Sequence, residues 1–120
     1  MEKLRVLIVE DNRVIAALLA ELIEAIGHEV CGIESSESGS MAAALRLQPD
    51  LMIVDAQLQD GSGISAVEAI ERDCHIPHIF VSGDASAVRR SKPNATVMQK
   101  PYFEVDLVLA IQSALSKAAP

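Results

Sequence analysis

Short apolar runs along the chain alternate with longer stretches in which apolar residues recur every three or four positions. Five such runs, rich in Val, Ile or Leu, have the length and composition of β-strands. They are "RVLIV", "HEVCGI", "LMIVD", "HIFV" and "ATVMQ", at residues 5–9, 28–33, 51–55, 78–81 and 95–99. The first and third are apolar almost throughout, which favours strands that are covered on both faces.

The stretches between these runs have the three- to four-residue spacing of helices with one apolar face. Helices are predicted over residues 12–27, 38–47, 62–73 and 103–117, with apolar residues Ile15, Leu18, Leu19, Leu22 and Ile26; Met41 and Leu45; Ile64, Val67 and Ile70; and Leu107, Val108, Ile111 and Leu115. Gly27 is a natural C-terminal stop for the first. Residues 83–94 have few apolar positions and contain Pro93, so a helix there is expected to be short or irregular.

The strand–helix alternation predicts an α/β fold, with a parallel sheet, helices on both faces and right-handed crossovers. The 120 residues fit one domain, 1–120, without an internal repeat or a linker. Half of the residues are apolar, which suffices for a core. The chain ends at Pro120, directly after the last predicted helix, so it is either a stand-alone protein or a domain excised from a longer one.

Charge and composition narrow the classes of partner. The chain has 17 acidic and 10 basic residues, a formal charge of −7, which disfavours nucleic acid and anionic membranes as partners. Cys31 and Cys74 form no CxxC pair and are interpreted as reduced thiols. No apolar run approaches the roughly 20 residues of a membrane span, and no signal-peptide pattern is present. We therefore expect a cytoplasmic protein.

Polar residues follow the predicted strands at the edge where function is expected in a doubly wound sheet, the carboxyl ends of the strands. These residues are Glu10 and Asp11, Asp55, Ser82, and Lys100. Helix capping by Asp11 or Asn12 explains an acidic residue after the first strand taken alone. Capping gives no reason for a lysine and a serine at the same edge, so the combination indicates a functional site.

Three neighbouring carboxylates repel one another by about 4 kcal/mol per close pair at an effective dielectric near 20. They must therefore take up protons or be neutralised by a cation. Oxygen ligands beside phosphate-binding groups suit Mg²⁺. Lys100 and Ser82 then bind phosphoryl oxygens while Asp55 attacks in line, which is the arrangement for phosphoryl transfer.

Four segments, "LIVEDN", "LMIVDAQLQDGSG", "FVSGD" and "MQKPY", together resemble the response-regulator receiver domain of two-component signalling, over the full chain. The resemblance implies a flavodoxin-like (βα)5 fold with a five-stranded parallel sheet in the order 2-1-3-4-5. It also implies a cis peptide bond between Lys100 and Pro101. Within the family, the chain is similar to stand-alone proteobacterial receivers with a reduced fourth helix.

The resemblance also implies a role for each site residue. Asp55 is the acceptor of a phosphoryl group from a sensor histidine kinase. Glu10, Asp11 and Asp55 hold Mg²⁺ together with the backbone carbonyl of Gln57. Ser82 is the switch hydroxyl and Lys100 contacts the phosphoryl group. Such a domain is a signalling protein rather than an enzyme, although it catalyses its own phosphorylation and dephosphorylation.

The partners implied are a sensor histidine kinase and either a histidine phosphotransfer protein or a downstream regulator. The family also implies a monomer or a weak dimer formed through the face of the fourth helix, the fifth strand and the fifth helix.

Two positions depart from the family pattern. Gln59 stands where receivers commonly have proline, and Val97 stands where most have a switch tyrosine or phenylalanine. A rotating aromatic therefore cannot carry the signal. Our hypothesis is that phosphorylation orders or shifts residues 83–94 directly; unchanged amide exchange there on activation would argue against it.

Alternatives to a phosphorylated receiver remain. A pseudo-receiver acting only through protein contacts is compatible with Val97, although the five intact site residues argue against it. A flavodoxin-like electron carrier needs a phosphate-binding loop where this chain has the acidic "EDNR". An aspartate-based phosphatase needs D-x-D where this chain has "EDN". The segment "CHIPH" at 74–78 lacks the four convergent ligands of a structural zinc site.

Overall fold

The computed structural model describes residues 2–118, and within this range five strands form one parallel sheet. These strands are β1 (Arg5–Val9), β2 (Glu29–Glu34), β3 (Leu51–Asp55), β6 (His78–Ser82) and β7 (Thr96–Gln99). Their spatial order is β2-β1-β3-β6-β7, which is 2-1-3-4-5 when the strands of this sheet are counted along the chain. The expected order is confirmed. The predicted end of the domain at Pro120 lies outside the described residues.

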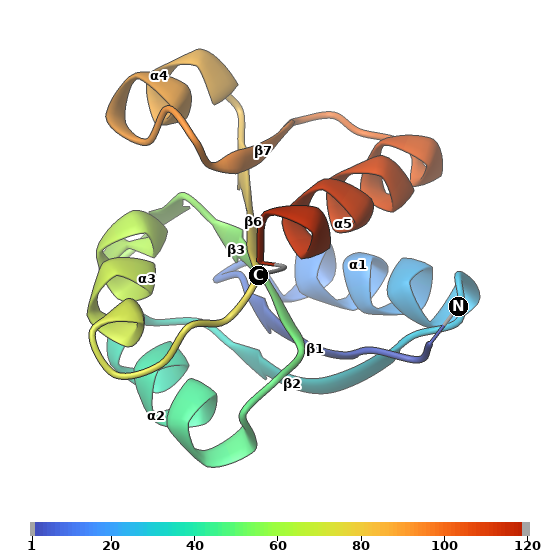
Figure 1. The fold of residues 1–120 in the computed structure, drawn as a ribbon, viewed down its shortest axis with the longest axis horizontal. Coiled ribbons are helices and arrows are strands. Elements are labelled where there is room, and N and C mark those ends of the chain that lie inside the picture. Colours follow the sequence, from blue (N-terminus) through green and yellow to red (C-terminus); the bar gives the residue numbers. More distant parts are fainter. Residues whose placement is uncertain (1, 119–120) are drawn as a thin grey trace.

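Helices cover both faces of the sheet (Figure 1). On one face lie α1 (Arg13–Ala25) and α5 (Glu104–Ala118), and on the other α2 (Glu37–Leu47) and α3 (Gly63–Glu71). The short α4 (Ala85–Ser91) lies beside β7 at the edge of the sheet. Within residues 2–118, no helix combines the length and the apolarity that crossing a bilayer demands. The parallel sheet with helices on both faces confirms the predicted doubly wound α/β fold.

Two core layers follow from the alternation of strand side chains between the two faces of the sheet. Ile8 and Ile53 pack with α1 and α5, whereas Leu7 and Met52 pack with α2 and α3. All five residues of β3 are buried because this strand lies in the middle of the sheet with helices on both sides. Asp55 is thus carried to the centre of the carboxyl edge by a strand that cannot easily move.

The predicted apolar faces of α1 and α2 are partly wrong. In α1 the buried residues are Ala16, Leu19 and Ile23, while Ile15 and Leu18 are 39% and 60% exposed. In α2, Met41 and Leu45 are likewise exposed, and the buried positions are Ser40, Ala43 and Ala44. Small side chains let each helix lie close to the sheet. The face predicted from the largest apolar residues therefore differs from the face that contacts the sheet.

One element was not predicted. A two-stranded antiparallel hairpin, β4 (Gln57–Leu58) and β5 (Gly61–Ser62), connects β3 to α3. Its strands are too short and too polar to give an apolar pattern, and the sequence analysis had assigned Ser62 to a helix. The short fourth helix, in contrast, is as expected, since α4 has seven residues and ends two residues before Pro93.

The close approach of Gly63 to β3 generates a stability prediction. A Cβ at Gly63 would overlap the carbonyl oxygen of Asp55 and lie 2.7 Å from Val54 Cγ1. We expect Gly63→Ala to lower the free energy of unfolding by about 1–3 kcal/mol, the usual cost of overpacking, in urea denaturation. Gly83→Ala is the control, because a Cβ there meets nothing within 4 Å. Equal stabilities of the two variants would contradict this account.

Candidate functional site

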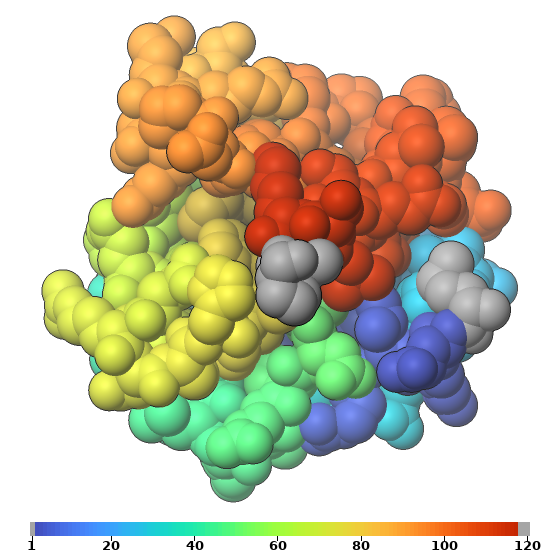
Figure 2. All heavy atoms as spheres, in the orientation of Figure 1, coloured from blue at the N-terminus to red at the C-terminus, as the bar shows by residue number. Residues whose placement is uncertain are grey.

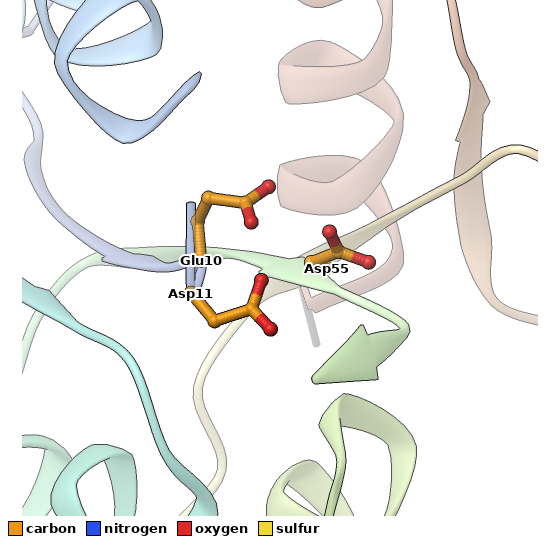
Figure 3. A group of neighbouring side chains, drawn as sticks. All are labelled: Glu10, Asp11 and Asp55. Atoms are coloured by element: carbon orange, nitrogen blue, oxygen red, sulfur yellow. The ribbon is translucent and has the colours of Figure 1, made fainter. Parts of the chain in front are cut away.

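Three carboxylates converge at the carboxyl edge of the sheet. Glu10 and Asp11 follow β1, Asp55 ends β3, and these two strands are hydrogen-bonded neighbours. One ligand oxygen from each lies within 4.8 Å of the others. Figure 3 shows the three side chains around one small space. The structure therefore brings together the acidic residues that the sequence analysis expected to meet.

Helix capping does not explain this group. The cap of α1 is Asn12, whose Oδ1 accepts hydrogen bonds from the N–H groups of Val14 and Ile15, both at 3.0 Å. Glu10 and Asp11 are thus not needed to satisfy the helix N-terminus. Of the two capping residues expected, Asn12 is confirmed and Asp11 is wrong.

Backbone N–H groups fix the direction of each carboxylate. Asn12 N donates to Glu10 Oε2 at 2.9 Å, and Gln57 N donates to Asp55 Oδ1 at 2.9 Å. Gln59 N donates to Asp11 Oδ2 at 2.6 Å. Each carboxylate keeps further lone pairs that can accept hydrogen bonds or bind a cation, so these bonds orient the group without using all of its acceptor sites.

Lys100 supplies the positive charge of the site. Its Nζ lies 2.9 Å from Asp55 Oδ2 and 3.9 Å from Glu10 Oε1. The backbone N–H of Lys100 also donates to the carbonyl oxygen of Ser82 at 2.8 Å, which joins the ends of β6 and β7. The peptide bond between Lys100 and Pro101 is cis, as the resemblance implied.

Ser82 and Gln57 lie beside the cluster. Ser82 follows Val81, the residue that pairs with Asp55 across β3 and β6, and its Oγ accepts the N–H of Asp84 at 2.9 Å. Gln57 is the first residue of the hairpin, and its N–H bonds to Asp55. Both positions agree with the roles expected for them, and these roles stay predictions.

The electrostatics of the cluster follow from crowding and burial. Burial is the main cause that raises the pKa of Glu10 to about 7; the carboxyl groups of Asp55 and Asp11 add to it, and the Asn12 N–H opposes it. The pKa of Asp11 is lowered, chiefly by its hydrogen bond with Glu10. Burial and the neighbouring carboxyl groups thus make the charged form of Glu10 less favourable than that of an exposed glutamate.

This set of donors fits a hard divalent cation. The oxygen atoms of Glu10, Asp11 and Asp55 are the kind of ligand that Mg²⁺ prefers, and Mg²⁺ is commonly held by one or two carboxylates together with water and phosphate oxygens. The trio is the one such group of His, Cys, Asp or Glu ligands found among the residues described. In "CHIPH", His75 Nδ1 and His78 Nε2 instead face Glu71, at 2.8 and 3.8 Å.

The sequence analysis missed Gln99, which fixes the loop after β6. Its Nε2 donates to the carbonyl oxygens of Gly83 at 2.6 Å and Lys100 at 3.0 Å, and its Oε1 accepts the N–H of Ala85 at 2.9 Å. The residue stands directly before Lys100 in "QKP", where a role was predicted for the lysine and a cis peptide bond before the proline, but nothing for the glutamine. Its contacts are to the backbone, so residue types at 83–85 gave no indication of them.

Comparisons with known proteins agree with the fold. A family model described as the response regulator receiver domain matches residues 6–112. The phyllosphere-induced regulator PhyR of Methylorubrum extorquens is 31% identical over 115 residues, which cover 92% of this chain and 43% of PhyR. This chain thus spans less than half of that relative.

Two further similarities extend over nearly the whole of both chains. The polar-differentiation response regulator DivK of Brucella ovis is 32% identical over 121 residues, covering 94% of this chain and 97% of DivK. The solution structure of the receiver domain of Erythrobacter litoralis PhyR has a TM-score of 0.88 at 30% identity, covering 100% of this chain and 96% of that one.

The ion pair of Lys100 generates a second stability prediction. Lys100→Met leaves the three carboxylates without their nearest cation, so in Mg²⁺-free buffer of low ionic strength we expect a loss of about 2 kcal/mol in the free energy of unfolding. Lys92→Met is the matched control. Lys92 Nζ pairs with Glu68 at 2.6 Å on the surface, and its loss is expected to cost much less because solvent screens an exposed pair. Equal losses in urea denaturation would show that the cluster does not depend on Lys100.

Proposed function

Because this chain belongs to the response-regulator receiver family, we propose that it is a phosphorylation-controlled signalling domain whose Asp55 accepts a phosphoryl group. The observation that carries the proposal is the Lys100 ammonium group 2.9 Å from Asp55 Oδ2, beside the acidic pair Glu10 and Asp11. A nucleophilic carboxylate, a cation-binding pair and a lysine are the parts that phosphoryl transfer requires. We propose that the described chain functions as one receiver domain.

In the reaction, Glu10, Asp11, Asp55 and the backbone carbonyl of Gln57 hold Mg²⁺, which when bound neutralises charge on the phosphoryl oxygens. The Gln57 N–H on Oδ1 keeps the Asp55 carboxylate facing its substrate. An Asp55 oxygen attacks phosphorus while the bond to the donor nitrogen breaks, and the leaving imidazole retains the electron pair. Lys100 then contacts a phosphoryl oxygen, and the Ser82 hydroxyl donates a hydrogen bond to another.

The surface next to Asp55 suits a protein donor. A groove of about 340 Å³ is lined by Asp55 and Lys100 together with apolar side chains of α1, among them Leu18 and Leu22. Leu18 is 60% exposed and Phe103, directly after the Lys100–Pro101–Tyr102 segment, is 74% exposed. A phosphohistidine must reach Asp55, so its carrier must cover this apolar surface. We propose a sensor histidine kinase or a histidine phosphotransfer protein as that carrier.

Output is proposed to pass through α4. In Figure 2 the residues of α4, in orange, stand out from the body of the molecule. Val97 lies half-buried against the core, so no aromatic ring at that position transmits the change. Gln99 and Ser82 both bond to the backbone at residues 83–85, which supports our hypothesis that this segment responds to phosphorylation. A downstream regulator or a second copy would bind the changed surface.

The second candidate is a pseudo-receiver that binds partners without phosphorylation, which is compatible with Val97. The two are separated by incubation with Mg²⁺ and acetyl phosphate, followed by intact mass. We expect the parent and Asp73→Asn to gain one phosphoryl group, because Asp73 is exposed and lies outside the cluster. Asp55→Asn is expected to gain none. No gain in a folded parent that binds Mg²⁺ would favour the pseudo-receiver.

A further prediction tests the docking surface. Leu18→Asp is expected to slow phosphorylation by a histidine kinase active on the parent about 10-fold, a loss of about 1.4 kcal/mol in docking. The rate with acetyl phosphate should stay unchanged, because a small donor needs no apolar surface. Leu45→Asp, at a 53% exposed position on α2, is the matched control and is expected to act like the parent with both donors. Equal kinase rates for the two variants would place the docking surface elsewhere.

A further inference from the structure

Gln99 lies next to both residues that are proposed to contact the phosphoryl group. It is the last residue of β7 and pairs with Ser82, the last residue of β6, in the parallel sheet. The next residue along the chain is Lys100, whose ammonium group lies 2.9 Å from Asp55 Oδ2. A movement of Ser82 or Lys100 therefore acts directly on Gln99.

The two ends of the Gln99 side-chain amide bond to different groups. Nε2 donates to the carbonyl oxygens of Gly83 at 2.6 Å and Lys100 at 3.0 Å. Oε1 accepts the N–H of Ala85, the first residue of α4, at 2.9 Å. This orientation of the amide fits its surroundings, because the nitrogen donates to carbonyl groups and the oxygen accepts from an N–H. The nitrogen is thus bonded toward the site and the oxygen toward the helix.

The start of α4 depends on these bonds because packing holds the helix only weakly. The buried residues of this seven-residue helix are Ala85 and Val88, and its other residues are half-buried or exposed. The first N–H groups of a helix have no partner within it. Gln99 supplies the acceptor for Ala85, and the Asp84 side chain accepts the N–H of Ala87 at 3.1 Å. The first turn of α4 is therefore positioned in part from β7.

Phosphorylation is expected to change the other side-chain attachment of this loop. Ser82 Oγ accepts the N–H of Asp84 at 2.9 Å. In the proposed reaction the same hydroxyl donates a hydrogen bond to a phosphoryl oxygen, so its direction toward Asp84 changes. Gln99 bonds to Gly83 and Ala85, on both sides of Asp84. The change at Ser82 thus reaches a segment that Gln99 connects to α4.

We propose that Gln99 is a positioning residue for signalling: its side-chain amide couples phosphorylation of Asp55 to the placement of α4, in a chain that has Val97 rather than an aromatic residue to carry the change. The inference rests on the proposed function, because it concerns how the state of Asp55 is passed on. Gln99 is assigned no contact with the phosphoryl group, so its role lies in transmission.

Two substitutions separate the two ends of the amide. Gln99→Glu keeps an oxygen acceptor for the Ala85 N–H and lacks the donor to Gly83 and Lys100, whereas Gln99→Met removes both. Gln112→Met is the matched control, because Gln112 is an exposed glutamine on α5. Each protein is incubated with Mg²⁺ and excess acetyl phosphate, and intact mass establishes whether a phosphoryl group has been gained.

Amide hydrogen exchange over residues 85–91 is then compared with and without acetyl phosphate. In the parent and Gln112→Met, phosphorylation is expected to change the exchange rate by about 5-fold or more, the lower end of typical coupling between sites. In Gln99→Glu, exchange without acetyl phosphate is expected to match the parent, and the change on phosphorylation is expected to be lost. In Gln99→Met, exchange is expected to be fast in both states. A purely structural role would leave the difference between the two states intact.

The possible outcomes separate the inference from the proposed function. If the parent gains no phosphoryl group, both fail. If the parent is phosphorylated without a change over residues 85–91, or if either Gln99 variant keeps the change of the parent, the inference is wrong and the phosphorylation of Asp55 stands. If Gln99→Glu gains no phosphoryl group while the parent does, Gln99 acts in phosphorylation itself, which would also overturn the inference.

Discussion

The ion pair between Lys100 and Asp55 is the interaction on which the site depends. Three carboxylates within 4.8 Å of one another repel strongly in a partly buried place, and the lysine ammonium at 2.9 Å is the nearest compensating charge that the described chain supplies. The raised pKa of Glu10, about 7, reflects burial and this crowding together. What remains is an excess of negative charge that a divalent cation can neutralise, so the crowding that destabilises the metal-free site favours binding of the cation.

The fold makes this crowding possible by rigidity at the strands and by hydrogen bonds in the loops. Buried β3 holds Asp55 between β1 and β6, so the acidic pair after β1 and Ser82 at the end of β6 arrive on either side of it. Lys100 follows the edge strand β7, and its backbone N–H donates to the carbonyl oxygen of Ser82 in β6. Loop amides from Asn12, Gln57 and Gln59 then set the direction of the three carboxylates. The strands thus set the positions of the site residues, and the backbone N–H groups set the orientations of the carboxylates.

Sequence reasoning reached the fold class and the edge that carries the site, because both follow from alternation and from the geometry of parallel sheets. The strand order and the cis bond before Pro101 came only from the family resemblance, since no local pattern encodes them. The faces of α1 and α2 were misplaced because Ala16 and Ala43 make the contact while larger neighbours stay exposed. The hairpin and the contact of Gln59 were missed because backbone groups form them, and these groups are common to nearly every residue type. The contacts of the Gln99 side chain were missed because its partners are backbone groups.

The measurement that tests the central claim most directly is the identity of the residue that carries the phosphoryl group. An acyl phosphate is reduced by borohydride to an alcohol, which marks the modified residue permanently for peptide mass spectrometry. After phosphorylation in Mg²⁺, the account predicts that the reduced product lies at Asp55 and at no other carboxylate. A product at Asp11 or at another carboxylate would contradict the account, because Lys100, the Gln57 N–H and the buried strand β3 would then be arranged around a group that does not react.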